Sequence, residues 1–244
     1  MTRIKATIEY DGTYYHGFQR QPGMTTIEST LVEAIQKVTG EKLELWAAGR
    51  TDARVHARGQ VIAFDTNSSI PPGRFARALN AVLPEDIKVL QSEEAAFGFH
   101  PRYDARLKHY SYLVYRQEAG RVFYRHQAYY LPYALDLGAM QEAAARLQGT
   151  HDFTSFCASG SGARNKIRTV VSCRVLERPP FLQINVVGDG FLYNMVRIIV
   201  GTLLKVGEKK MVPDQIDEVI QGRNRALAGP TVPPQGLYLM AVIY

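Results

Sequence analysis

Ionisable side chains recur at every second position in one short segment, residues 49–60, whose sequence is GRTDARVHARGQ. In an extended backbone, alternate residues point to the same side. Five of them would then share one face: Arg50, Asp52, Arg54, His56 and Arg58. Nearby positive charge favours the ionised form of a carboxyl group, so we expect a lowered pKa and an anionic Asp52 at neutral pH.

The chemistry open to Asp52 is limited by its neighbours. A metal site is disfavoured because arginines repel a cation and the next acidic residue along the chain is Asp65. A paired-carboxylate hydrolase is disfavoured because such sites need a second carboxyl group that is held protonated. An anionic nucleophile and a structural ion pair on a basic ribbon remain. On chemistry alone the ion pair is favoured, because such networks perturb pKa values without catalysing a reaction.

Length, composition and charge narrow the class of protein. With 244 residues, 46% of them hydrophobic, the chain is expected to fold as a soluble protein of one large domain or two modest ones. No stretch reaches the roughly twenty apolar residues of a membrane span, and no apolar signal segment opens the sequence, so we expect a cytoplasmic location. Cys157 and Cys173 form no Cys-x-x-Cys pair, which disfavours structural zinc and disulfides. The net charge of +6 favours a polyanionic partner.

Hydrophobic periodicity predicts similar successions of strands and helices in two halves, residues 1–104 and 105–244. In the first half, we predict strands over 4–10, 43–45, 61–64 and 87–90, and helices over 27–38 and 71–82, the first with a Thr25–Glu28 capping box. In the second half, we predict strands over 105–116, 170–178, 181–187 and 237–243, a turn over 151–156, and helices over 136–148, over 191–201 and from 213. This order indicates an α+β fold of two split βαβ halves, although no residue-level repeat relates them.

Two loops and one helix contain further residues that are candidates for RNA contact or for pairing with Asp52. Residues 13–23 interleave aromatic and basic side chains, which suits base stacking and phosphate contact, although ordinary loop packing explains them equally well. Residues 159–168 combine small residues with three cations, and could close over a phosphate backbone or simply be solvated. The helix predicted over 191–201 is apolar on almost every side except at Arg197. A buried arginine is unfavourable unless it is paired, and Asp52 is a reasonable partner.

Several motifs together resemble the tRNA pseudouridine synthase A family. In chain order they are GRTD at 49–52, VHA at 55–57, FHPR at 99–102, Tyr110, HDFTSF at 151–156, NMVR at 194–197 and GLYL at 236–239. The resemblance covers essentially the whole chain, and the GRTD element is its most specific part. The sequence departs from the family pattern at Arg54, where the family usually has glycine.

The resemblance implies an isomerase that needs no cofactor and no metal. Its implied reaction converts uridine to pseudouridine at positions 38, 39 and 40 of the tRNA anticodon stem-loop. The implied structure is the pseudouridine synthase fold, in which two ferredoxin-like α+β halves form a central, mainly antiparallel sheet with a basic cleft. Residues 1–104 would carry the Asp52 loop and residues 105–244 would complete the active site. The implied assembly is a homodimer.

The resemblance also implies roles for individual residues. Asp52 is the expected nucleophile, attacking either ribose C1′ or uracil C6 of a uridine flipped out of the helical stack. Tyr110 would pack against the base, and its hydroxyl could assist proton removal from C5, although an ordinary tyrosine with a pKa of about 10 is a weak base. Arg197 would pair with Asp52, and these three are the expected catalytic residues. The expected substrate-binding residues are Tyr110, Arg50, Leu237, His56, Arg58, Arg164, Lys166 and Arg168.

Two other classes of protein remain open from sequence. A non-catalytic RNA-binding protein or RNA chaperone would explain the charge and the aromatic residues, but it would tolerate loss of Asp52. An RNA methyltransferase would need a pocket for a methyl donor, for which the sequence has no glycine-rich signature. Dependence on an added cofactor would identify the methyltransferase.

Overall fold

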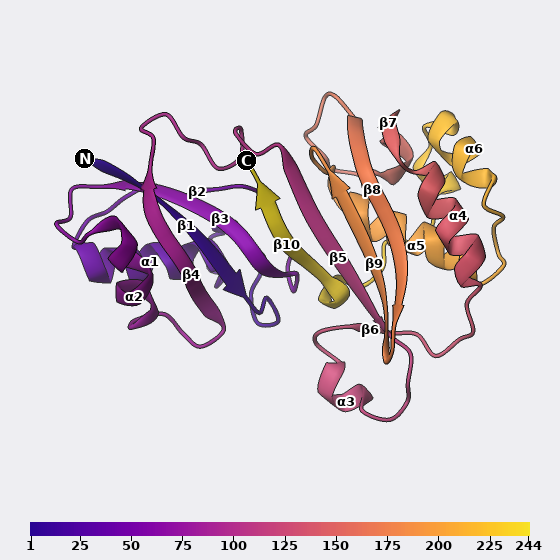
Figure 1. The fold of residues 1–244 in the computed structure, drawn as a ribbon, viewed down its shortest axis with the longest axis horizontal. Coiled ribbons are helices and arrows are strands. Elements are labelled where there is room, and N and C mark those ends of the chain that lie inside the picture. The colour runs from indigo at the N-terminus through magenta and orange to yellow at the C-terminus, as the bar shows by residue number, and fades with distance from the viewer. The chain divides into compact units, whose positions relative to one another are not determined.

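The computed structural model describes residues 1–244, which form two compact units. Unit 1 comprises residues 1–106 together with 238–244, and unit 2 comprises residues 107–237. Each unit combines helices with a mostly antiparallel arrangement of strands (Figure 1), which confirms the predicted α+β class. None of the helices has both the length and the apolar composition needed to cross a bilayer.

The strands of unit 1 follow the order β4-β1-β3-β10, and β2 also pairs with β3. They are β1 (Thr2–Tyr10), β2 (Trp46–Ala47), β3 (His56–Thr66), β4 (Ile87–Ala95) and β10 (Leu237–Ile243). β1 is antiparallel to both β3 and β4, whereas β10 runs parallel to β3 and places Tyr238 opposite His56. Every second residue of β1 from Ile4 to Tyr10 is buried, as the alternation in the sequence predicts.

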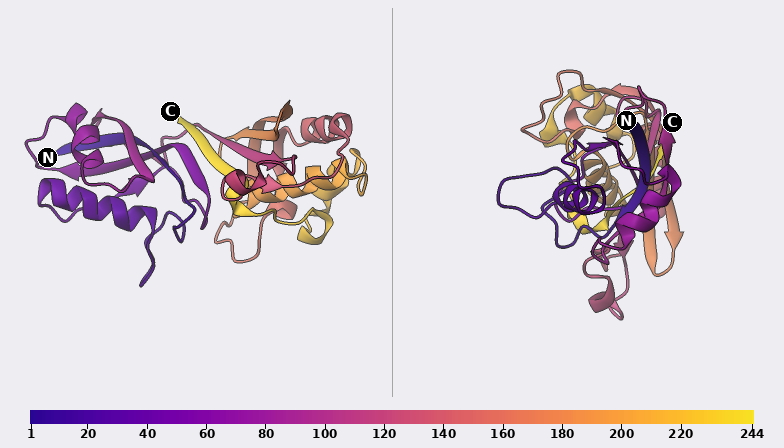
Figure 2. Two further views of the ribbon diagram at one scale, coloured as in Figure 1. Left: turned by 90° about the horizontal axis from the view of Figure 1, so that it is seen from below. Right: turned by 90° about the vertical axis from the view of Figure 1, so that its left-hand side faces the viewer.

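Helix α1 (Ile27–Thr39) runs along one face of this sheet (Figure 2). The predicted capping box at the start of α1 is wrong by one residue. The capping box joins Thr26 to Ser29 rather than Thr25 to Glu28. Ser29 N donates to Thr26 Oγ1 at 3.2 Å, while Glu28 accepts a hydrogen bond from Arg20 N at 2.6 Å. The second predicted helix is confirmed as a short 3-10 segment, η1 (Pro72–Arg74), continued by α2 (Phe75–Asn80).

The strands of unit 2 follow the order β5-β9-β8-β7, and β6 pairs with β5. They are β5 (Leu107–Tyr115), β6 (Tyr129–Tyr130), β7 (Gly149–Asp152), β8 (Ile167–Arg178) and β9 (Phe181–Gly188). β8 and β9 confirm the predicted hairpin. β7 corrects the turn predicted over 151–156, because this backbone pairs with β8 before the 3-10 segment η2 (Thr154–Phe156) begins.

The helices of unit 2 are α3 (Arg121–Tyr124), α4 (Leu137–Arg146), α5 (Met195–Gly207) and α6 (Gln215–Gly222), with the 3-10 segments η3 (Arg225–Leu227) and η4 (Pro234–Gly236). α4 packs against β8, and α5 contacts both α4 and β5. α5 begins at Met195, not at 191 as predicted. Asn194 has a left-handed backbone, so the right-handed helix cannot extend further toward the N-terminus.

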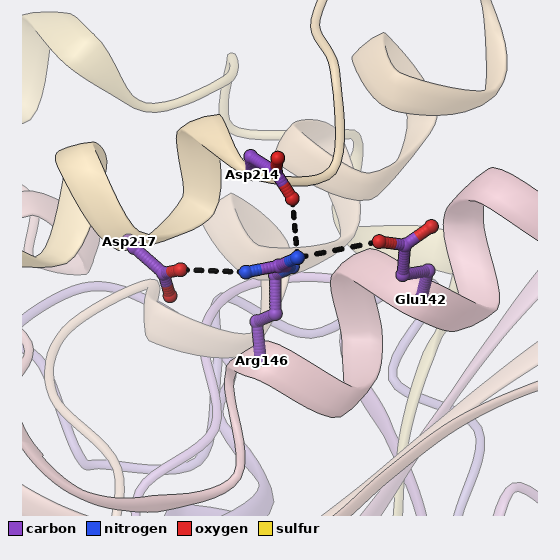
Figure 3. A network of polar contacts seen from close by, with 4 residues as sticks. All are labelled: Glu142, Arg146, Asp214 and Asp217. Atoms are coloured by element: carbon purple, nitrogen blue, oxygen red, sulfur yellow. Dashed lines mark hydrogen bonds and ion pairs between the residues drawn. The ribbon is translucent and has the colours of Figure 1, made fainter.

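Arg146 in the last turn of α4 joins this helix to α6 (Figure 3). Its Nη1 lies 2.7 Å from Asp217 Oδ2, and its Nη2 lies 3.3 Å from Glu142 Oε1. The same nitrogen pairs with Asp214, the residue that precedes α6. The cluster therefore links α4 to the start of α6 through partly exposed ion pairs.

Candidate active site

Asp52 lies on the loop between β2 and β3, and this loop is not extended. Val55 N donates to Asp52 O at 3.2 Å, which closes a turn, and Arg54 within it has a left-handed φ of 65°. The prediction of five ionisable side chains on one extended face is therefore wrong, since only His56 and Arg58 belong to a strand. His56 is buried, whereas Arg58 and Arg54 are exposed, as is Arg50.

A second loop, residues 11–18, holds the Asp52 loop on both sides of the carboxylate. Phe18 N donates to Thr51 O at 2.9 Å, and Arg54 N donates to Tyr15 O at 3.3 Å. Gly17 allows this close approach, because it has a φ of +90° and a Cβ there would lie 2.9 Å from Thr51 O. The backbone that carries Asp52 is thus anchored immediately before and two residues after it.

The buried side chain of Tyr10 contacts the Asp52 loop. Tyr10 OH lies 2.7 Å from Thr51 Oγ1, one residue before Asp52. Burial raises the pKa of Tyr10 to about 12, with hydrogen bonds from Thr51 and Gln60 acting in the opposite direction. Tyr10 therefore stays neutral and serves as a structural hydrogen-bonding group.

His56 follows the loop and is fixed by Asp11 and Tyr238. Its Nδ1 lies 3.1 Å from Asp11 Oδ1 and also 3.1 Å from Gly12 N, and its ring stacks on Tyr238 with 4.7 Å between centroids. The two contacts of Nδ1 exclude each other, because the amide needs a lone pair there and the carboxylate needs a proton. We favour the proton on Nδ1, since a bare lone pair would face an anion. Partial burial raises the pKa of Asp11, but bonds from His56 and Thr13 outweigh it and hold that pKa below its usual range.

Unit 2 contains the other two expected catalytic residues, Tyr110 on β5 and Arg197 in the first turn of α5. Tyr110 is 8% exposed and packs against Phe191 in a T-shaped arrangement, with 5.2 Å between the ring centroids. Arg197 donates from Nε to Val232 O and from Nη1 to Asn194 Oδ1, each at 2.7 Å. Helix α5, which carries Arg197, contacts β5, which carries Tyr110. Burial raises the pKa of Tyr112 on the same strand well above its ordinary value, and the positive charge of Arg197 opposes this shift only in part.

The remaining expected residues of unit 2 are one apolar and three basic side chains. Leu237 is 6% exposed and directly follows Gly236, which packs against Tyr112 so closely that a Cβ would lie 2.7 Å from its ring. The basic residues occupy one segment before and within the start of β8, where Arg164 is exposed and the other two are half-buried: Arg164, Lys166 and Arg168. We call this segment, residues 164–168, the basic segment.

The expected residues therefore fall in two sets, one in each unit. Unit 1 holds Arg50, Asp52, His56 and Arg58, and unit 2 holds Tyr110, Arg164, Lys166, Arg168, Arg197 and Leu237. Sequence reasoning assigned no role to the residues that hold them in place, although it included Asn194 in the NMVR motif. These residues are Asp11, Gly17, Phe191, Asn194 and Val232. Asp11 was interpreted only as part of a turn, and the glycine at 17 inside an aromatic loop was the one local signal of a close backbone approach.

The chain matches a family model described as tRNA pseudouridine synthase over residues 6–104 and 143–244. A tRNA pseudouridine synthase A from Syntrophomonas wolfei is 53% identical over 244 residues, which cover 100% of this chain and 98% of that protein. Proteins of the same name from Acetivibrio thermocellus and Bacillus subtilis are each 47% identical, over 100% of both chains and 99% of both chains respectively. Among solved structures, a chain of an archaeal box H/ACA sRNP Nop10–Cbf5 complex aligns with a TM-score of 0.37 and 14% identity, covering 83% of this chain and 44% of that one.

Proposed function

The chain belongs to the tRNA pseudouridine synthase A family, a family of isomerases, and we propose that it converts uridine to pseudouridine at positions 38, 39 and 40 of the tRNA anticodon stem-loop with Asp52 as its nucleophile. One observation carries the assignment of Asp52. It follows the Gly-Arg-Thr element in a turn whose backbone is anchored by Phe18 N and Tyr15 O. A nucleophile held on a fixed backbone meets its substrate in one geometry.

The proposed reaction exchanges one glycosidic bond for another. The bond between uracil N1 and ribose C1′ breaks, the base rotates, and a bond forms between C5 and C1′. C5 loses its proton and N1 gains one, so the product is an isomer of the substrate. Asp52 would act as an anion, either on C1′ to release the base or on C6 to activate it. Water must be excluded meanwhile, because it would hydrolyse a released or covalently held intermediate.

Tyr110 and Arg197 complete the proposed catalytic set. Tyr110 would pack against the flipped base, and its edge contact with Phe191 gives its ring a fixed direction. Arg197 would pair with Asp52, keeping the carboxylate ionised and oriented. Its hydrogen bonds to Val232 O and Asn194 Oδ1 help to fix the plane of the guanidinium group, which supports a role that depends on orientation.

The proposed substrate contacts are mostly basic. Arg50 and Arg58 are exposed near Asp52, and the basic segment of unit 2 adds Arg164, Lys166 and Arg168. Leu237 would form an apolar wall of the uracil pocket. His56 is buried, so its contribution to substrate binding in this proposal is indirect, through the loop that it holds. A homodimeric assembly and a cytoplasmic location belong to the same proposal, and sedimentation velocity of the purified chain tests the dimer.

The experiment that tests the function is release of tritium from tRNA labelled at C5 of uridine, with no cofactor added. We expect release by the wild type and none by Asp52→Asn, which keeps the shape of the side chain and removes its charge. Asp65→Asn is the matched control, because Asp65 pairs with Arg3 in the same unit. No release by the wild type despite tight tRNA binding would indicate a binding protein. Sequencing of the modified tRNA then shows whether the sites are 38, 39 and 40.

A further inference from the structure

Asn194 occupies the N-terminal boundary of α5 in an unusual way. An asparagine at this position commonly has an extended backbone and caps the helix with its side chain. Here the backbone is left-handed, with φ 59° and ψ 9°, and the side chain makes no capping bond. Only its carbonyl starts the helix, by accepting from Ile198 N at 3.0 Å. The residue therefore has a left-handed backbone, which asparagine adopts more readily than most residues, and its side chain does not cap the helix.

The side chain of Asn194 serves Arg197 instead. Asn194 Oδ1 accepts from Arg197 Nη1 at 2.7 Å, and the second support is Val232 O, which accepts from Arg197 Nε at 2.7 Å. A left-handed backbone at 194 turns the side chain back toward the first turn of α5, where Arg197 lies. The left-handed backbone and the absent cap therefore accompany a contact between the Asn194 side chain and one guanidinium group.

The other support, Val232 O, is fixed by a close crossing of the chain over α5. A Cβ at Gly201 would lie 1.9 Å from Pro230 O, so only glycine fits there. Gly229 N donates to Thr202 Oγ1 at 2.8 Å, which ties the same crossing to the helix. Val232 O is therefore held against α5, and Asn194 adds a hydrogen bond to Nη1, at the other end of the guanidinium group.

We propose that Asn194 is a positioning residue that orients Arg197 for the isomerisation. The inference rests on the proposed function, in which Arg197 pairs with Asp52 and holds it as an anion. Removal of the Asn194 side chain would take away the hydrogen bond between Asn194 Oδ1 and Arg197 Nη1, so the guanidinium group would turn more easily about Val232 O. The positive charge of Arg197 would remain near Asp52, but the orientation of the guanidinium group would vary. We therefore expect kcat to fall while tRNA affinity stays the same.

The test is Asn194→Gly, measured by tritium release under single-turnover and steady-state conditions. Glycine adopts the left-handed backbone without strain, so this variant removes the Oδ1 acceptor and keeps the fold. We expect kcat to fall about tenfold, a typical effect of lost orientation, with KM for tRNA changed less than about twofold. Lys209→Gly is the matched control, because Lys209 has the same φ of 59° just beyond the other end of α5 and is exposed. It should keep wild-type kcat.

A double mutant separates positioning from a general structural effect. In the Arg197→Lys variant the planar guanidinium group is absent, so Asn194 has nothing to orient. If Asn194 acts through Arg197, adding Asn194→Gly to this variant should lower kcat by less than about twofold. A full additional loss in that background, or wild-type kcat for Asn194→Gly alone, overturns the inference. The inference is also overturned if Asn194→Gly melts at a lower temperature than Lys209→Gly and its loss of activity is explained by that loss of stability. No release by the wild type itself would instead reject the proposed function, and this role with it.

Discussion

His56 Nδ1 lies 3.1 Å from Asp11 Oδ1, a contact that ties the start of β3 to the end of β1. The two strands are neighbours in the sheet, and the Asp52 loop enters β3 at His56. Asp11 also accepts from Thr13 N at 2.9 Å, so one carboxylate organises both the histidine and the loop that anchors Asp52. The Asp11–His56 pair is thus a support of the proposed nucleophile rather than part of the chemistry.

Asp11→Asn should weaken this support. We expect a loss of about 1 kcal/mol in the free energy of unfolding, because the carboxylate is 41% exposed and solvent screens its interactions. We expect kcat to fall severalfold with tRNA affinity unchanged, as the Asp52 loop loosens. Denaturant unfolding and tritium release measure the two effects. Asp104→Asn, which removes another loop-capping carboxylate of unit 1, should leave kcat as it is; an equal loss there would contradict the specific role of Asp11.

Arg54→Gly should stabilise the protein. Arg54 has a φ of 65°, in the region that costs a residue with a Cβ about 1 to 2 kcal/mol. Glycine relieves that strain but loses more chain entropy on folding, by about 0.5 to 1 kcal/mol, so the net gain lies between about 0 and 1.5 kcal/mol, centred on about 0.75 kcal/mol. Arg54→Ala removes the same charge and keeps the strain, and should therefore show no gain. Thermal unfolding of the two variants side by side tests this, and equal stabilities would refute the strain.

The ion pair between Arg3 and Asp65 predicts a pH dependence of stability. Hydrogen bonds from Arg3, each 2.7 Å long, lower the pKa of Asp65, with burial opposing them. The pKa of Asp65 is lower in the folded protein than in the unfolded chain, where it is about 3.9. The ion pair therefore contributes its full stability at pH values above about 3.9, and this contribution is lost as the pH falls below that value. Arg3→Met should cost about 2 kcal/mol at pH 7, and its difference from the wild type should shrink below about pH 4. Lys5→Met, which removes a more exposed pair with Glu93, should cost under about 1 kcal/mol.

Much of the fold follows from the sequence, because local patterns specify it. The alternation in β1, the hairpin of β8 and β9, and the helical spacing of α1 each lie within one short segment. The missed features depend on contacts between distant segments or on single dihedral angles. The Asp11–His56 contact has no local signature. The left-handed angle of Arg54 occurs at a residue type that seldom adopts it, and asparagine, which adopts it more often, gave no sign of whether Asn194 would. The motif around Asp52 was visible in the sequence, whereas the loop that anchors it was not.

Removing charge from the basic segment should weaken tRNA binding in a salt-dependent way. The triple variant Arg164→Gln, Lys166→Gln and Arg168→Gln should reduce the slope of log Kd against log salt by about 0.7 to 0.9 for each phosphate that is no longer neutralised. Fluorescence anisotropy with labelled tRNA over a salt series measures the slope. As a control we choose three exposed lysines of unit 1, replaced as Lys37→Gln, Lys42→Gln and Lys88→Gln. An identical slope for both triple variants would show that binding depends on net charge alone.

Gly17→Ala should impair the reaction more than it impairs folding. Gly17 has a φ of +90°, and a Cβ there would lie 2.9 Å from Thr51 O and 3.3 Å from the carbonyl carbon of Asp52. The methyl group must therefore push the Asp52 backbone, and a displaced nucleophile loses about tenfold or more in kcat. Gly23→Ala is the matched control, because Gly23 also has a positive φ, +71°, but nothing within 4 Å of the added methyl group. Both variants carry the left-handed strain of about 1 to 2 kcal/mol, so only the contact with the Asp52 loop distinguishes them. Equal turnover by the two variants would show that the position of this loop does not limit the reaction.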